Sequence, residues 1–190
     1  MAGTQGSRTN RRYDPDRRDR IIDSCLDVIA EHGVAGTSAR RVAAAADVPL
    51  GSMTYHFEGM DELLREAFRR FVGEVASTFE RRLSAASTPA EAREAVVSLI
   101  TEDVFGTQRE LVLTHELYTL AARDERYREL TSEWMSRSRV ELERHFDALT
   151  ARMLDAMLEG LTIHRALDVV AHDPGVAREA VERIVGVELA

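Results

Sequence analysis

Side chains able to contact nucleic acid are concentrated between residues 37 and 56. Arg40 and Arg41 can donate paired hydrogen bonds to phosphates or to guanine. Hydroxyl groups and rings from the same stretch can reach base edges and the sugar-phosphate backbone. We therefore predict DNA contacts from Thr37, Ser38, Arg40, Arg41, Leu50, Gly51, Ser52, Thr54, Tyr55 and His56.

The residues around these candidates predict two short helices joined by a tight turn. Thr37 or Ser38 can cap the first helix, and Pro49 suits the first turn of the second, where its missing N–H costs no hydrogen bond. Met53 and Phe57 are four residues apart and should pack inward, which leaves their polar neighbours, Ser52 included, facing outward. This is the pattern of a helix-turn-helix DNA-binding unit.

The segment from Gly33 to Leu63 resembles the helix-turn-helix of TetR-type transcriptional regulators, whose pattern is T-x-x-x-[IV]-A-x-x-A-G-V-S-x-G-x-[LI]-Y-x-[HY]-F-x-[SG]-K-[DE]-x-L after a helix that ends near a glycine. The positions in step with it are Gly33, Thr37, Val42, Ala43, Ala46, Val48, Gly51, Ser52, Met53, His56, Phe57, Gly59, Asp61 and Leu63. The resemblance implies a homodimeric regulator, most commonly a repressor, that leaves a palindromic operator when a small molecule binds.

Three positions depart from the family pattern. Asp47 replaces the turn glycine, and aspartate can adopt the left-handed conformation that the turn requires. Thr54 stands at the usual tyrosine and Tyr55 follows it, so either residue could make the phosphate contact. Met60 replaces a phosphate-binding lysine. These departures keep open a second interpretation, an all-α ligand-binding or adaptor protein with a non-functional helix-turn-helix.

The charge distribution agrees with DNA binding at one end of the chain. The 190 residues carry a formal net charge of -8. Residues 1–57 contain eight arginines and seven acidic residues, net +1, whereas residues 58–190 contain seventeen arginines and twenty-six acidic residues, net -9. A dimer could therefore turn its less acidic end toward the phosphates and its acidic bulk away from them.

Hydrophobic spacing of helical period runs through most of the chain, and no alternation typical of strands occurs, so we predict an all-α fold. We expect a flexible basic arm at 1–13, a helix-turn-helix domain at 14–59, and a helical effector-binding and dimerisation domain at 60–190. Arg8, Arg11 and Arg12 of the arm could reach the minor groove. The helices expected around the turn motif and after it are 14–32, 60–86, 90–105, 108–122, 125–149, 150–167 and 176–187.

Motifs of catalysis are missing from the sequence. The six histidines lack zinc-binding spacing, and no nucleotide-binding loop or serine-hydrolase elbow occurs. We therefore predict no enzymatic activity, no metal and no cofactor. The single Cys25 excludes an intrachain disulfide, and its place on an amphipathic helix indicates a core thiol rather than a redox sensor. No apolar run has membrane-spanning length, which predicts a soluble cytoplasmic protein.

The family resemblance also implies a small-molecule cavity within the larger domain. Aromatic and methionine side chains could line such a cavity or fill a dry core, and their spacing does not distinguish the two. Polar groups between them could orient a ligand. The pocket candidates are Phe105, His115, Tyr118, Thr119, Trp134, Ser138, Met153 and Met157.

Apolar stripes on the last two expected helices predict the dimer contact. We expect a single chain not to cover them fully, and pairing with a two-fold mate would form a four-helix bundle. The residues assigned to this interface are Leu158, Leu161, Val176, Ala177, Ala180, Val181 and Ile184.

Overall fold

The computed structural model describes residues 15–170, 173 and 175–186, and this part of the chain contains helices and no strand, which confirms the all-α prediction. The predicted basic arm lies outside the described residues. The elements are α1 (Arg17–Gly36), α2 (Ala39–Ala45), α3 (Gly51–His56), α4 (Met60–Ser84), α5 (Pro89–Ser98), a short π-helix η1 (Leu99–Asp103), α6 (Gln108–Ala121), α7 (Glu125–Leu142), α8 (Ala148–Leu167) and α9 (Gly175–Val185).

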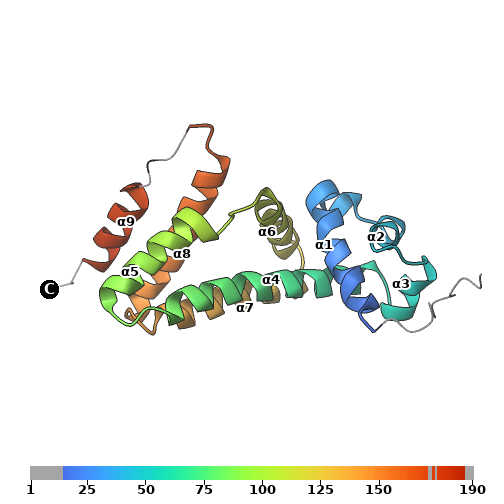
Figure 1. Cartoon of the computed structure of the whole chain (residues 1–190), viewed down its shortest axis with the longest axis horizontal. Coiled ribbons are helices and arrows are strands. Elements are labelled where there is room, and N and C mark those ends of the chain that lie inside the picture. The colour runs from blue at the N-terminus through green and yellow to red at the C-terminus, as the bar shows by residue number, and fades with distance from the viewer. Residues whose placement is uncertain (1–14, 171–172, 174, 187–190) are drawn as a thin grey trace, which may run out of the picture.

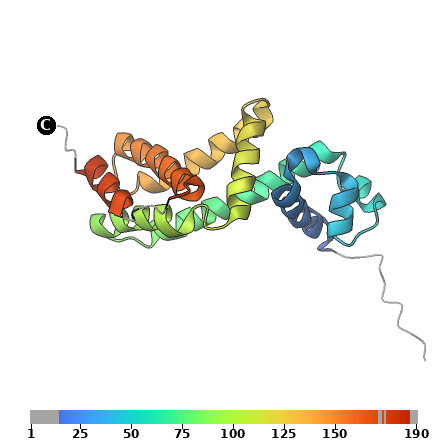
Figure 2. The ribbon, with the colours of Figure 1, turned by 90° about the horizontal axis from the view of Figure 1, so that it is seen from above.

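The molecule is elongated, and α4 runs along most of its length (Figure 1). Helices α1, α2 and α3 form one end, whereas α5, α8 and α9 form the other (Figure 2). Helix α7 packs along α4, and α6 lies between the two ends, in contact with α1 and α7. The two long helices therefore connect the predicted DNA-binding end to the rest of the chain.

Two hydrophobic cores hold these helices together. The first joins α1, α2, α3 and the first part of α4 to α6 and α7, with Phe68, Leu113 and Leu117 fully buried. The second joins the distal part of α4 to α5, α8 and α9, around Leu83 and Leu154. Because the first core contains residues of α6 and α7, the helix-turn-helix shares that core with helices that follow it in the chain.

Side-chain caps decide several helix boundaries. Ser38 accepts a hydrogen bond from the Arg41 backbone N–H and begins α2, and Thr88 forms a capping box that begins α5. The expected helix over 125–149 is wrong, because the chain leaves the helix after Leu142 and the Asp147 carboxylate caps α8. The expected helix over 90–105 is also interrupted, since its last part winds into η1.

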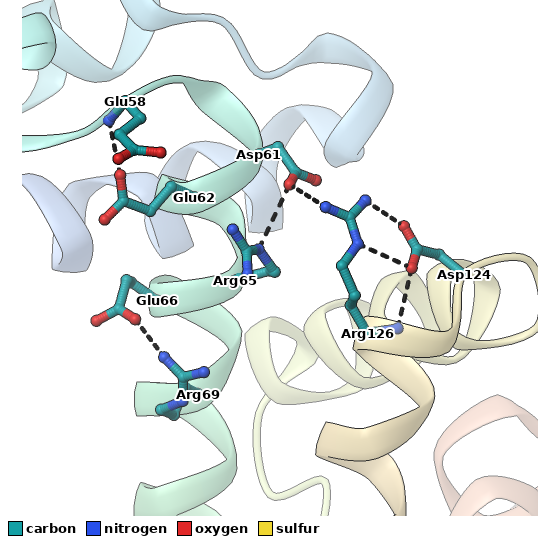
Figure 3. A network of polar contacts seen from close by, with 8 residues as sticks. All are labelled: Glu58, Asp61, Glu62, Arg65, Glu66, Arg69, Asp124 and Arg126. Carbon is teal, nitrogen blue, oxygen red and sulfur yellow. Dashed lines mark hydrogen bonds and ion pairs between the residues drawn. The ribbon is translucent and has the colours of Figure 1, made fainter.

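Ion pairs connect the start of α4 to the start of α7. Arg126 donates to Asp61 on α4 at 2.6 Å and to Asp124, the residue that caps α7, at 2.6 Å (Figure 3). These bonds raise the pKa of Arg126 and lower that of Asp124. The contact is solvent-exposed, so it orients the two helices more than it stabilises them. No helix in the described part of the chain is long and apolar enough to cross a membrane.

Candidate nucleic-acid interface and internal cavity

Helix α3 presents its polar side to solvent at one end of the molecule (Figure 1). Met53 and Phe57 are buried, as their spacing predicts, and Tyr55 is 83% exposed. Asp47 has a backbone φ of 50°, so it adopts the left-handed conformation expected at the turn between α2 and α3. The two short helices thus form the predicted helix-turn-helix geometry.

One predicted contact residue of α3 points the wrong way. Ser52 is buried next to Met53, so the expected outward orientation of this hydroxyl is wrong. A helix as short as α3 has little stability of its own. It therefore buries Ser52 against its neighbours in addition to Met53 and Phe57. Thr54 is exposed, and its hydroxyl donates to the Gly51 carbonyl at 3.2 Å.

The candidates on and before α2 divide into hydroxyl groups that bond at the helix ends and exposed arginines. Thr37 donates its hydroxyl to the Gly33 carbonyl at 2.8 Å, while Ser38 caps α2. Arg40 and Arg41 are both exposed, and the Arg41 guanidinium donates to the Gly36 carbonyl. That bond uses one of five donors, so the guanidinium can still reach a phosphate.

Leu50, Gly51 and His56 complete the predicted surface. Leu50 is half exposed and Gly51 is exposed at the beginning of α3. His56 is partly buried, and its ring meets the edge of Tyr55 with 4.8 Å between ring centroids. Helix α3 therefore offers a mixed aromatic and polar surface, with Tyr55 its most exposed large side chain.

A small cavity, partly open to solvent, lies between α4, α6, α7 and α8 and has a volume of about 40 Å³. Four of the predicted pocket residues, from three parts of the sequence, line it together: Phe105, Tyr118, Trp134 and Ser138. Tyr118 stacks on Trp134 with 6.1 Å between ring centroids, and Phe71 meets Trp134 edge-on at 6.2 Å. The cavity therefore has an ordered aromatic wall.

Two acidic residues on α8 also line this cavity, and the sequence analysis did not identify them. Asp155 and Glu159 are four residues apart and share one face of α8 with Leu158 and Thr162. Burial raises the pKa of Asp155, although Arg139 lies 3.3 Å away. Burial and a hydrogen bond to Glu159 raise the pKa of Tyr118. The α8 face therefore combines negative charge with partial desolvation.

Four other pocket candidates lie elsewhere. His115 and Thr119 line a separate, open hollow between α6 and the end of α8. The His115 ring Nδ1 is engaged with the Leu111 carbonyl at 2.7 Å. Met153 is 45% exposed, and Met157 packs against the second hydrophobic core. Methionines on α8 point away from the cavity because Asp155 and Leu158 occupy its inner face.

The predicted dimer surface is only partly available. Leu158, Ala177 and Val181 are buried within the chain, so their assignment to a subunit interface is wrong. The reason is that α9 turns its apolar stripe toward α5 and α8 of the same chain. Leu161, Ala180 and Ile184 are partly covered in the same way, whereas Val176 is 43% exposed.

A different apolar face of α8 is largely exposed to solvent. Its residues recur at alternating spacings of four and three, the pattern of a helix that packs on another helix. Two are leucines that are 57% and 59% exposed, at positions 149 and 167. The face consists of Leu149, Met153, Ala156, Gly160, Ile163 and Leu167.

Cys25 is fully buried in the first core, as predicted for a core thiol. Burial raises the pKa of this thiol to about 12. The thiolate is therefore scarce at neutral pH, which makes Cys25 a poor nucleophile.

A family model for bacterial regulatory proteins of the tetR family matches residues 21–67. Three solved structures are similar over most of the chain. SCO7518 from Streptomyces coelicolor A3(2), assigned to the transcriptional regulators, is 57% identical with a TM-score of 0.85, covering 90% of this chain and 99% of its own. The multidrug binding protein EbrR, complexed with imidazole, is 36% identical with a TM-score of 0.78, covering all of both chains.

The third structure is a member of the TetR family, SCO1917 from Streptomyces coelicolor A3, with 34% identity, a TM-score of 0.71 and coverage of 90% of this chain and 99% of its own. Other EbrR structures contain ethidium, proflavin or malachite green, with 35%, 34% and 32% identity to this chain. Given this similarity over nearly the full length and the exposed helix-turn-helix, the chain belongs to the TetR family of bacterial regulatory proteins, ligand-responsive DNA-binding regulators of transcription.

Proposed function

We propose that this protein is a homodimeric repressor that leaves its operator when an aromatic cation enters and widens the cavity between α4, α6, α7 and α8. The observation that carries the ligand class is the position of Asp155 and Glu159 in a cavity whose wall contains the stacked rings of Tyr118 and Trp134. Carboxylates in a partly buried site favour a positive ligand, and aromatic rings attract cations to their faces.

The ligands of the similar protein EbrR support this class. Ethidium, proflavin and malachite green differ in shape, but all are flat or propeller-shaped aromatic cations. Their shared property is a delocalised positive charge, which matches acidic residues beside an aromatic wall. A neutral aromatic compound of the same size would leave Glu159 without a charged partner.

At the DNA end, the proposed contacts come from α2 and α3. Arg40 and Arg41 would position the protein on phosphates, and Thr54 and Tyr55 would reach base edges or the backbone. We place Ser52 outside this set because it is buried. We keep the domain division predicted from the sequence. In this proposal residues 14–59 bind DNA, and residues 60–190 bind the effector and the second subunit.

The proposed dimer contact is the exposed face of α8. Ala156 and Gly160 are small, and a Cβ added to Gly160 would meet nothing within 4 Å, so a partner helix could approach closely there. Leu149 and Leu167 flank this centre with apolar surface. Two chains paired by a two-fold axis would bring two copies of α3 to one palindromic site.

The test uses DNA from upstream of the coding region and two forms of one dye. Malachite green is a cation, and its reduced leuco form is neutral at pH 7.5 with a similar skeleton. We expect fluorescence anisotropy to show DNA binding, release by malachite green, and no release by the leuco form. Glu159→Gln should bind the DNA like the wild type but resist the dye, which also controls for any effect of the dye on DNA.

The outcomes separate the alternatives. Equal release by both forms of the dye would refute the requirement for a cation. If the wild type binds malachite green but neither this DNA nor any sequence selected from a random library, the chain is a ligand-binding protein with a non-functional helix-turn-helix. If malachite green still releases the Glu159→Gln variant from the DNA, the ligand site does not lie at this face of α8.

A further inference from the structure

A second small cavity, also partly open to solvent, adjoins the first between α4, η1 and α6 and has a volume of about 30 Å³. The two cavities share Val75, Phe79, Val104 and Phe105 in their linings. Phe105 follows η1 and has a φ of 51°, an unusual backbone conformation for a bulky residue. The cavities are therefore neighbouring chambers with these side chains at their common wall.

The second cavity contains a polar group without a partner. Thr114 on α6 is fully buried, and its Oγ1 has no hydrogen-bond partner in the described part of the chain. Helical threonines usually donate to the carbonyl four residues earlier, as Thr162 does to Leu158 at 2.9 Å. A buried hydroxyl without a bond is unfavourable, so a ligand group that bonds to Thr114 would gain affinity.

Carboxylates in the two cavities follow the same arrangement. In each cavity one is neutralised by an arginine: Asp103 accepts two bonds from Arg82 at 2.7 and 2.8 Å, and Asp155 pairs with Arg139. The other carboxylate, Glu110 in the second cavity and Glu159 in the first, makes no ion pair with any described residue. Each chamber thus offers one carboxylate for a positive ligand group.

We propose that the two chambers, widened as the ligand enters, form one site for an elongated ligand with two cationic centres. An aromatic cation lies against Tyr118 and Trp134 near Glu159, and a tail carrying an ammonium or amidinium group reaches Glu110 and Thr114. The tail carries N–H groups because both of these side chains can accept hydrogen bonds from them. This inference rests on the proposed function and adds a second charged subsite to it.

The experiment compares three aminoacridines by calorimetry on the full chain without DNA: the parent cation, the same compound with an aminopentyl tail, and that compound with its tail acetylated. The ammonium and acetamide tails have similar length but differ in charge. We expect the ammonium tail to bind wild type about tenfold tighter than the acetamide tail, the difference that one charge-assisted hydrogen bond provides.

Two variants locate the effect. Glu110→Gln should abolish the advantage of the ammonium tail, and Thr114→Val should reduce it, while both variants bind the parent aminoacridine like the wild type. Thr114→Val should not lower the melting temperature, since it removes a hydroxyl that has no partner. Glu159→Gln is the matched control, because it should weaken all three compounds alike.

Equal binding of the two tails to wild type, or an ammonium advantage that persists in Glu110→Gln, would overturn the two-chamber site and leave the aromatic-cation site intact. If the parent aminoacridine binds to Glu159→Gln and wild type equally, the proposed cation site itself fails. A lower melting temperature of Thr114→Val would show that the hydroxyl is bonded within the protein, and its role toward the tail would then be rejected.

Discussion

Gly33 interrupts α1 and permits the strongest prediction about stability. Its φ of 69° and ψ of 168° belong to a region that glycine occupies and other residues avoid. A Cβ at this position would also lie 2.8 Å from the Glu116 Oε1 on α6. Gly33→Ala therefore has to strain the backbone and displace a side chain.

The backbone strain should dominate the effect. A residue forced into this region costs about 1–3 kcal/mol, whereas the Glu116 carboxylate is the end of a flexible side chain and can rotate away. For a chain of this length, each kcal/mol lowers the melting temperature by about 2–4 °C. We expect Gly33→Ala to melt roughly 2–12 °C below wild type.

Thermal unfolding followed by circular dichroism measures this difference. The control is Gly73→Ala, because Gly73 lies within α4 and an added Cβ there meets nothing within 4 Å. Replacing a helical glycine by alanine should stabilise by about 0.5–1 kcal/mol. Adding Glu116→Ala to Gly33→Ala should recover only a small part of the loss. Full recovery, or a Gly33→Ala variant as stable as wild type, would refute the strain argument.

Three further measurements test the DNA end, the dimer and the core. Tyr55→Ala should weaken operator binding in an anisotropy titration by about 1–3 kcal/mol, with an unchanged melting temperature because the ring is exposed; unchanged affinity would remove Tyr55 from the interface. Met153→Glu should convert the dimer to monomer in sedimentation velocity, whereas Val140→Glu, at an exposed position of α7, should remain dimeric; dimers from both would place the interface elsewhere. Iodoacetamide at pH 8.5 should alkylate Cys25 in native protein roughly three orders of magnitude more slowly than in unfolded protein, since the native thiol has a pKa of about 12; equal rates would contradict its burial.

The helix-turn-helix could be predicted from the sequence because it depends on short-range interactions. The cap by Ser38, the left-handed Asp47 and the buried pair Met53 and Phe57 each depend on residues within a few positions of one another. Such short-range relations hold in many tertiary contexts, so spacing and residue type suffice to predict them. These rules did not predict the burial of Ser52, because that burial depends on how closely α3 packs against the neighbouring helices.

The cavity and the subunit surface were decided by tertiary structure. Asp155 and Glu159 become ligand candidates only because α8 packs with that face toward Tyr118, which is distant in the sequence. The apolar stripe through Ala177 is real, but the chain's own α5 and α8 cover it. An amphipathic pattern determines that a helix face is buried; which partner buries it depends on long-range packing, and the same pattern is compatible with an intrachain core or a second subunit.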